Sequence, residues 1–227
     1  CNKDMTGAQT VNHDAIIYML DALRDDQVVL MPTTNSAYGS GNKDNFCDEN
    51  SVLNPISKYA LDKVAVEKKL MERKNSISFR LATVFGMSPK MRIDLLVNDF
   101  VYRATKDGFV VLYESHFKRN YIHVQDVVSV FIHALNNFEK MQGEIFNVGL
   151  SDANLSKLEL CERIKLQVKN FIIMDAPMAK DPDQRNYIVS NKKIESTGWK
   201  PNKSLDDGIF ELIKGYKMLV NSRYGNV

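Results

Sequence analysis

Apolar positions in the first third of the chain alternate between helical and strand spacing. Between residues 14 and 23, apolar side chains recur every three to four positions, as on one face of a helix. Between residues 76 and 81, they recur at every second position, which is typical of a strand. In chain order, the predicted elements are a helix over residues 14–23, a short buried strand over 27–31, a polar loop over 33–54, a helix opening at 54–55 and running to about 74, and a strand over 76–81.

This order of elements predicts a fold class. Helices that alternate with strands are typical of an α/β protein with a doubly wound parallel sheet. Such sheets bind their ligands beyond the carboxyl ends of the strands. The loops that follow Met31 and Leu81 are therefore expected to face a ligand site.

The pattern beyond residue 86 is mixed rather than cleanly alternating. It predicts helices over residues 92–106, 124–136, 156–168 and 205–219, and strands over 109–113 and 145–148. Ser156 with Glu159, and Ser204 with Asp207, have the spacing of capping boxes at two of these helix starts. With no internal repeat and no low-complexity linker, the two halves are expected to pack as one unit.

Composition narrows the class of protein. The chain has 227 residues, of which 44% are hydrophobic and 26% charged, and its 30 basic and 28 acidic residues are scattered along the sequence. This indicates a soluble globular protein without a nucleic-acid-binding or membrane surface. Cys1, Cys47 and Cys161 show neither metal-ligand spacing nor a disulfide framework, and no apolar run reaches the roughly 18 residues of a membrane helix. A cytoplasmic setting is expected.

Tyr59 and Lys63 are the first candidates for chemistry. They lie four residues apart on a predicted helix, so both side chains share one face. An ammonium beside a phenol favours the phenolate and is expected to lower the phenol pKa, which would make Tyr59 a useful proton carrier. Tyr102 and Lys106 repeat the same spacing, so spacing alone does not identify a site.

The surroundings of the two pairs differ. Thr34, 25 residues before Tyr59, stands where a buried strand ends in a small polar run. A hydroxyl at that point can hydrogen-bond a substrate hydroxyl beside the tyrosine. No comparable residue accompanies Tyr102, so Tyr59 is the favoured candidate.

Six motifs in order extend this interpretation over nearly the whole chain. The chain resembles the extended short-chain dehydrogenases/reductases, in their NAD-dependent nucleotide-sugar epimerase/dehydratase branch. The matching segments are residues 34–39, 55–63, 80–86, 119–127 and 144–149, and the closing elements 183–187 with 193–201.

The resemblance implies a fold, cofactors and site residues. The fold would be the second half of a Rossmann-type doubly wound sheet over residues 1–90, with a smaller mixed α/β substrate-binding region over 91–227, of which about 120–150 returns to the sheet. The cofactor would be NAD or NADP, the substrate a nucleotide-diphosphate sugar, and the assembly a homodimer. The implied roles are catalysis by Thr34, Tyr59 and Lys63, cofactor contact by Tyr59, Lys63 and Ala82, and substrate contact by Thr83, Arg119 and Arg185.

Within that resemblance, the two arginines would bind the substrate pyrophosphate through paired guanidinium hydrogen bonds. His123 is expected to pack structurally rather than to catalyse. Thr83 departs from the family, which usually has asparagine at that position. The glycine-rich cofactor turn is also absent, and the sequence starts after the family's fourth strand, near the position of Asn12.

The residues after Thr34 indicate the type of reaction. Dehydratases of this branch have an Asp-Glu pair there and decarboxylases a glutamate, whereas this chain has Asn35 and Ser36, which cannot act as carboxylate acids or bases. Ser36 and Ala37 also lack the acid/base group of the 3,5-epimerases. What is left is a 4-epimerase, or an oxidase or reductase, working by hydride transfer at carbon 4. The alternative is a truncated or split-gene fragment that binds a nucleotide sugar or a partner chain without activity of its own.

Overall fold

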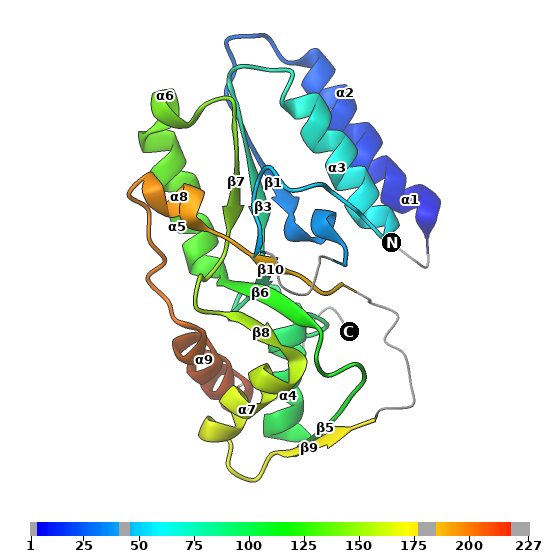
Figure 1. Ribbon diagram of the computed structural model, residues 1–227, viewed down its shortest axis with the longest axis vertical. Coiled ribbons are helices and arrows are strands. Elements are labelled where there is room, and N and C mark those ends of the chain that lie inside the picture. Colours follow the sequence, from blue (N-terminus) through cyan, green and yellow to red (C-terminus); the bar gives the residue numbers. More distant parts are fainter. Residues whose placement is uncertain (1–3, 41–45, 177–184, 219–227) are drawn as a thin grey trace.

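A three-stranded parallel sheet forms the centre of the first half of the molecule (Figure 1). The structure is a computed structural model that describes residues 4–40, 46–176 and 185–218. The strands are β1 (Val29–Thr34), β3 (Ser76–Leu81) and β7 (Glu144–Val148), in the order β1-β3-β7. The α/β fold with a parallel sheet is therefore confirmed, and β7 returns from the second half of the chain to this sheet.

Helices cover both faces of the sheet (Figure 1). On one side lie α3 (Lys58–Leu70) and an N-terminal helical segment made of α1 (Met5–Gln9), the π-helix η1 (Thr10–Asp14) and α2 (Ala15–Ala22). Apolar side chains of α2 and α3 form a cluster with Val29 and Met31 of β1. On the other side lies α5 (Val124–Asn136), whose Phe131 ring is 4.9 Å from that of Phe79 in β3.

The prediction of a loop over residues 33–54 is wrong in part. Strand β1 continues through Thr34, and it is followed by the 3₁₀-helix η2 (Asn35–Tyr38) and by β2 (Phe46–Cys47). Among the described residues β1 pairs with β3 only, so Pro32 lies on an edge strand, where a missing N–H is tolerated. Gly39 ends η2 with φ of 63°, and a side chain there would collide with the carbonyl oxygen of Asn54.

Two helix starts also differ from the prediction. Helix α3 begins at Lys58 rather than at residues 54–55, because the Ser57 hydroxyl caps it by accepting from the Ala60 amide at 3.2 Å. The N-terminal helical segment starts at Met5 rather than at 14, since the Asp4 carboxylate accepts from the Gly7 amide at 2.8 Å. In a sequence, a polar residue that caps a helix looks the same as a polar residue of the preceding loop, so both helix starts were misplaced.

Besides the strand predicted over residues 109–113, the second half contains short strands that periodicity did not predict. A three-stranded sheet has the order β4-β6-β8, in which β4 and β6 are parallel and β6 and β8 antiparallel. Two further parallel pairs join β5 to β9 and β2 to β10. The strands are β4 (Thr83–Phe85), β5 (Phe109–Leu112), β6 (Lys118–His123), β8 (Asn154–Ser156), β9 (Ile172–Asp175) and β10 (Ile188–Val189).

The other helices of this half are α4 (Leu96–Lys106), α6 (Phe138–Met141), α7 (Lys157–Gln167), α8 (Lys192–Ser196) and α9 (Leu205–Met218). Helices α7 and α9 start within one residue of the predicted positions, α4 starts at Leu96 rather than at 92, and α6 and α8 were not predicted. The capping box of Ser156 and Glu159 is confirmed, and Ser204 and Asp207 exchange the same pair of hydrogen bonds. His123 is fully buried and caps α5 by accepting from the Gln125 amide at 3.2 Å, in agreement with the structural role expected for it.

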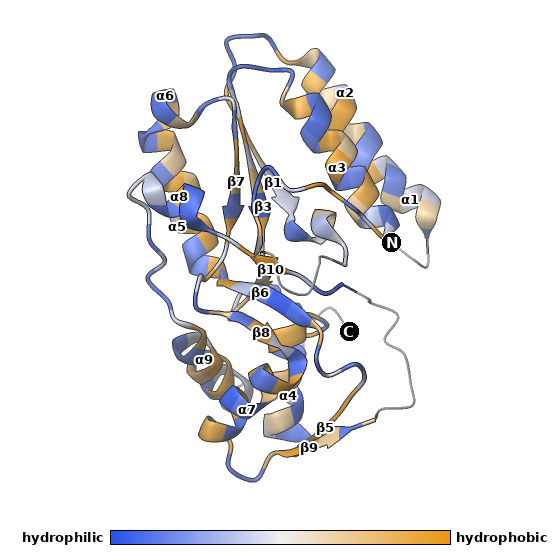
Figure 2. Ribbon diagram, viewed as in Figure 1, coloured by the Kyte–Doolittle hydropathy of each residue, from blue (hydrophilic) through white to orange (hydrophobic). Residues whose placement is uncertain are grey.

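One hydrophobic core runs through both halves. A single cluster joins Ile77 and Phe79 of the parallel sheet to Phe100 of α4 and Leu212 of α9. Figure 2 shows the corresponding hydrophobic stretches on the strands and on the inward faces of the helices. The boundary at residue 90 stays a prediction, but the two halves pack as one unit, as expected. Among the described residues, no helix has both the length and the apolar character needed to cross a bilayer.

Candidate active site

A cavity of about 690 Å³ opens where β1 and β3 end. This is the edge of a doubly wound sheet at which ligands bind. The cavity also reaches the second half of the molecule, through β6 and the start of α7. It is lined by Asn12, Pro32, Thr33, Thr34, Ser36, Tyr59, Lys63, Leu81, Ala82, Thr83, Val84, Arg92, Asp94, Leu95, Leu96, Arg119, Lys157, Arg185 and Tyr187.

All seven residues singled out from the sequence line this one cavity. They come from five places in the fold: the end of β1, one face of α3, the exit of β3, strand β6, and the segment before β10. The fold brings them together because parallel strands carry their loops to the same edge and β6 lies beside the exit of β3. The seven are Thr34, Tyr59, Lys63, Ala82, Thr83, Arg119 and Arg185.

Burial controls the protonation of Tyr59. Burial raises the pKa of its phenol above the ordinary value, while the positive charges of Arg185 and Arg92 oppose this increase. The expectation that Lys63 lowers this pKa is wrong in direction, since the net shift is upward and Lys63 is not among its causes. Lys63 itself has its pKa lowered by burial, and its Nζ donates to the Pro32 carbonyl at 3.4 Å.

Thr34 is the last residue of β1 and lines the cavity. Its Oγ1 accepts from the Ser36 amide at 3.1 Å, which caps η2. The hydroxyl proton can therefore still be donated to a ligand. Ser36 accepts in turn from the Arg185 guanidinium, so Arg185 is held against the start of η2.

Arg119 is a buried cation in the cavity wall, with 2% of its surface exposed. Its Nη1 donates to the Lys118 carbonyl at 3.0 Å, and its Cζ lies 5.6 Å from the centre of the Tyr187 ring. Both contacts fix a long side chain in place. A fixed guanidinium offers paired donors to phosphate oxygens.

Several lining residues were not predicted. Arg92 comes from the loop between β4 and α4 and makes a two-point ion pair with Asp94, at 2.9 and 2.8 Å. Lys157 is the first residue of α7, and Tyr187 lies beside Arg119. Asn12, which was noted only as the place where the resemblance starts, enters the cavity from the π-helix η1. A π-turn inside a helix is a recurrent mark of functional sites, but this one is visible only in the structure.

Tyr102 and Lys106, the second pair with this spacing, lie outside the cavity lining. Tyr102 is half-buried and packs edge-to-face on Tyr216 at 5.4 Å, outside the lining of the cavity.

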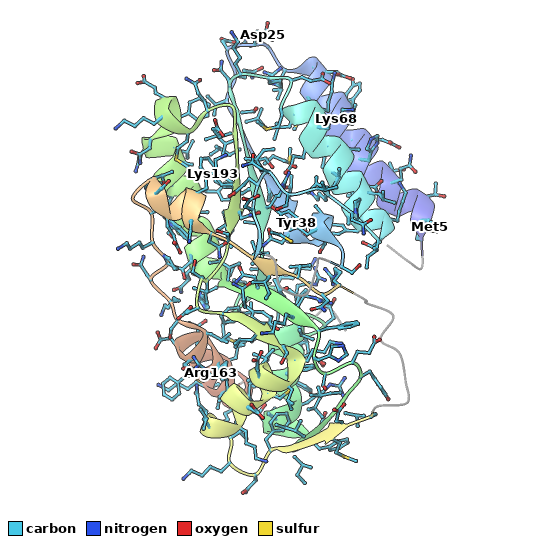
Figure 3. The ribbon with its side chains drawn as sticks, in the orientation of Figure 1. Met5, Asp25, Tyr38, Lys68, Arg163 and Lys193 are labelled. Atoms are coloured by element: carbon cyan, nitrogen blue, oxygen red, sulfur yellow. The ribbon has the colours of Figure 1, made fainter. Side chains whose placement is uncertain are left out.

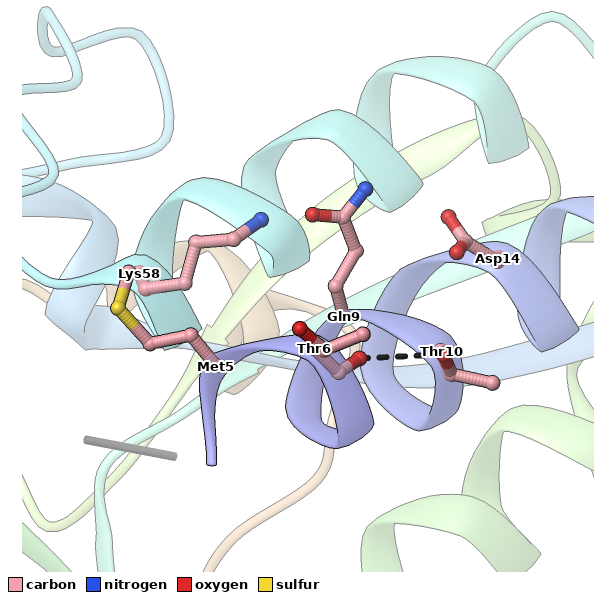
Figure 4. A pocket seen from close by; sticks show the side chains of 6 residues that line it. All are labelled: Met5, Thr6, Gln9, Thr10, Asp14 and Lys58. Atoms are coloured by element: carbon pink, nitrogen blue, oxygen red, sulfur yellow. Dashed lines mark hydrogen bonds between the residues drawn. The ribbon is translucent and has the colours of Figure 1, made fainter. Parts of the chain in front are cut away.

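A second hollow, of about 270 Å³, lies between α1 and the start of α3 and contains Lys58, Gln9 and Asp14 (Figure 4). It is open to solvent at the outer side of the helices and contains none of the seven residues.

The residues present fit the nicotinamide half of a dinucleotide. Lys63 presents an ammonium with three donors, of which one is directed to Pro32, so donors are left for ribose hydroxyls. Ala82 gives the wall a small side chain directly beyond β3. Tyr59 lies on the same helix face as Lys63, one turn before it.

Comparisons with known proteins agree with this geometry. The chain is 28% identical over 193 residues to the CDP-paratose 2-epimerase of Salmonella typhi, covering 78% of this chain and 56% of that protein. It is 28% identical over 203 residues to the dTDP-4-dehydro-6-deoxyglucose reductase of Escherichia coli, covering 85% and 62%. The UDP-glucose 4-epimerase of Thermus thermophilus, solved in complex with NAD, matches with a TM-score of 0.78 at 23% identity over 93% of this chain and 71% of that one.

The chain is shorter than these proteins. It spans 54–70% of the length of four curated relatives that it matches. The family described as the NAD dependent epimerase/dehydratase family matches residues 1–149, which is more than half of the chain. The sequence motifs, the parallel sheet and this match together show that the chain belongs to the NAD dependent epimerase/dehydratase family.

Proposed function

We propose that this chain belongs to a cytoplasmic enzyme that transfers a hydride at carbon 4 of a nucleotide-linked sugar, with NAD or NADP as cofactor. The observation that supports this most strongly is the shared cavity, which contains a proton-carrying pair at one sheet edge and buried cations suited to a diphosphate. The product is the 4-epimer, the 4-keto sugar or, from a 4-keto substrate, the 4-hydroxy sugar, since Asn35 and Ser36 provide no carboxylate for elimination.

In the proposed reaction, the chain positions the sugar and moves one proton. Thr34 donates its hydroxyl proton to a sugar oxygen, and Tyr59 exchanges a proton with the oxygen on carbon 4. Lys63 would orient the cofactor ribose, with Ala82 beside it, and a bound NAD or NADP would supply the hydride acceptor or donor. Thr83, Arg119 and Arg185, which line the same cavity, hold the substrate.

The raised pKa of Tyr59 bears on the direction of the reaction. Its phenol is protonated at neutral pH, which suits proton donation to a ketone. Sugar oxidation requires the phenolate, so the oxidation rate is expected to rise with pH towards the phenol pKa. Arg92 and Arg185 both stabilise the phenolate through their charge.

The proposal is tested by incubating the chain with NAD or NADP and a panel of UDP-, GDP-, CDP- and dTDP-linked sugars, with product analysis by NMR. We expect an epimer or ketone at carbon 4 of at least one substrate. The sequence contains no glycine-rich turn to bind the cofactor pyrophosphate, so we expect the dissociation constant of NAD to lie above the low micromolar range. The assay therefore needs millimolar cofactor. Calorimetry with NAD checks this affinity. Diphosphate binding without any change at carbon 4 would favour the alternative of a binding fragment.

Removing Arg119 is expected to weaken substrate binding. A charged bidentate contact is worth roughly 1.5 to 3 kcal/mol, so Arg119→Ala should raise the dissociation constant of UDP or GDP by about ten- to a hundredfold. Arg119→Lys should restore only part of the affinity, because an ammonium cannot reproduce the planar fork. Affinity for NAD should not change. If every diphosphate tried binds both variants as tightly as the wild type, Arg119 has no role in substrate binding.

We also propose a homodimer formed through the outer face of the helices at one edge of the molecule (Figure 1). This face exposes Val11 by 67% and Tyr18 by 78% from the N-terminal helical segment, and Leu61 by 51% from α3. Exposed apolar groups on neighbouring helices are typical of a contact surface. Tyr18→Arg should shift the sedimentation mass from dimer to monomer, whereas Phe210→Arg, on the exposed face of α9, should leave it unchanged.

A further inference from the structure

Lys157 is a buried lysine in the wall of the cavity, outside the seven residues that the sequence indicated. It is the first residue of α7, and only 4% of its surface is exposed. Its Nζ donates to the Tyr113 carbonyl at 2.8 Å and lies 5.4 Å from the centre of the Phe117 ring. Lysine is among the residues least often buried.

The strand register places Lys157 on the same face as Arg119. In the antiparallel pair of β6 and β8, Arg119 is opposite Leu155. Two residues beyond that pair, the Lys157 amide donates to the Phe117 carbonyl, which continues the pairing. Opposed residues share a face, and residues two apart on a strand share it as well. Phe117, Arg119 and Lys157 therefore stand on one face, and both cations line the cavity.

Arg185 lies on the other side of β6. The Tyr187 amide donates to the Lys118 carbonyl at 3.3 Å, so the segment that contains Arg185 and Tyr187 lies beside β6. The two residues are two apart, and both line the cavity. Arg185, Arg119 and Lys157 thus come from three neighbouring segments. Adjacent strands lie about 4.8 Å apart, so the row extends over roughly 10 Å at the level of the backbone.

From this row we propose that Lys157 is a third ligand of the substrate diphosphate, acting from the end of the row opposite Arg185. Arg185 is held against Ser36, two residues after Thr34, and so marks the sugar end of the cavity. Lys157 then lies at the nucleoside end, where its ammonium reaches the phosphate that bears the nucleoside. The inference rests on the proposed function only in its choice of substrate class.

A purely structural role accounts for less of what is observed. The hydrogen bond to the Tyr113 carbonyl needs a donor, and an uncharged donor would supply it. A positive charge in the first turn of a helix is unfavourable, because the amino end of the helix already carries partial positive charge. An anion bound in the cavity would interact favourably both with this ammonium and with the amino end of the helix.

The test compares Lys157→Gln with Lys157→Met, and uses Lys165→Gln as the matched control. Glutamine removes the charge and keeps a donor for Tyr113, whereas methionine removes both. Lys165 is an exposed lysine of the same helix and lies outside the cavity lining. Dissociation constants for UDP, GDP, CDP, dTDP and UMP are measured by calorimetry at low and high salt, and urea unfolding reports stability.

We expect Lys157→Gln to bind the preferred nucleoside diphosphate about ten- to a hundredfold more weakly than the wild type, with near-normal stability. The loss of affinity should also be seen with UMP, since UMP retains the phosphate that bears the nucleoside. The salt dependence of binding should become less steep, which a structural role would not cause. Lys165→Gln should behave as the wild type.

Two results would overturn the inference. One is unchanged nucleotide affinity in Lys157→Gln with lower stability in Lys157→Met, which would leave Lys157 as a support for Tyr113. The other is a wild-type chain that binds none of these nucleotides. If the charge-dependent loss is found but no sugar is converted, the inference stands and only the proposed function fails.

Discussion

Tyr59→Phe is expected to reduce hydride transfer by about 10²- to 10⁴-fold, the usual contribution of a positioned acid or base. The change removes one hydroxyl and almost no volume, so the cavity and the cationic row should be preserved. Nucleoside diphosphate affinity should therefore stay within about threefold of the wild type, by the same reasoning as for other volume-conserving changes. Rates with saturating cofactor and the dissociation constant of UDP are the two measurements.

Tyr102→Phe is the matched control, because Tyr102 and Lys106 have the same spacing as the proposed pair. Tyr102 packs against Tyr216 and lies outside the cavity lining, so its hydroxyl should be dispensable. We expect activity near that of the wild type. Equal loss of activity in the two variants would mean that the cavity does not identify the catalytic tyrosine.

Arg80→Met is expected to destabilise the fold by about 3–5 kcal/mol, because it leaves a buried carboxylate without its cation. Arg80 and Glu67 are 3% and 4% exposed, and the guanidinium contacts the carboxylate through Nη2 at 2.6 Å and Nε at 3.0 Å. The same carboxylate accepts from Ser78 at 2.7 Å and Thr33 at 3.0 Å. The pair therefore ties α3 to β1 and β3 directly behind the cavity.

Urea unfolding measures this loss. Arg163→Met serves as the control, since Arg163 pairs with Asp206 at a surface where both side chains are about half exposed, and such pairs contribute about 0–1 kcal/mol. The double variant Arg80→Met/Glu67→Leu should be more stable than Arg80→Met alone, because it removes the uncompensated charge. A loss in Arg80→Met no larger than in Arg163→Met would show that the buried pair contributes little.

The same network explains a residue of the family motif. Tyr38, near the middle of the molecule in Figure 3, accepts from Arg80 Nη1 at 3.0 Å and donates to Asn147 Oδ1 at 2.7 Å. Asn147 belongs to β7, so Tyr38 connects η2 to a strand more than a hundred residues away. The tyrosine of the 34–39 motif thus fixes the polypeptide that carries Thr34 and Ser36.

Local patterns predicted the parts of the structure that neighbouring residues decide. Strand β3 and helix α5 have the predicted bounds, because their alternating or helical apolar positions extend over whole elements. The four-residue spacing of Tyr59 and Lys63 was likewise sufficient to put both on one face of α3. The first part of the closing family motif was assigned to residues 183–187, and residues 183 and 184 lie outside the described residues.

Tertiary structure alone decided the rest. Strands of two or three residues, such as β10 and β8, are too short for a period to be visible and form only because a partner strand is present. The upward shift of the Tyr59 pKa comes from burial, with opposition from Arg92 and Arg185, residues 33 and 126 positions away in the sequence. Lys157 stands beside Arg119 only through the register of β6 and β8. Sequence thus determined the longer elements and the shared helix face of the proposed catalytic pair, because these depend on residues within a few positions of one another. The charge around that pair depends on long-range packing, which no local pattern encodes.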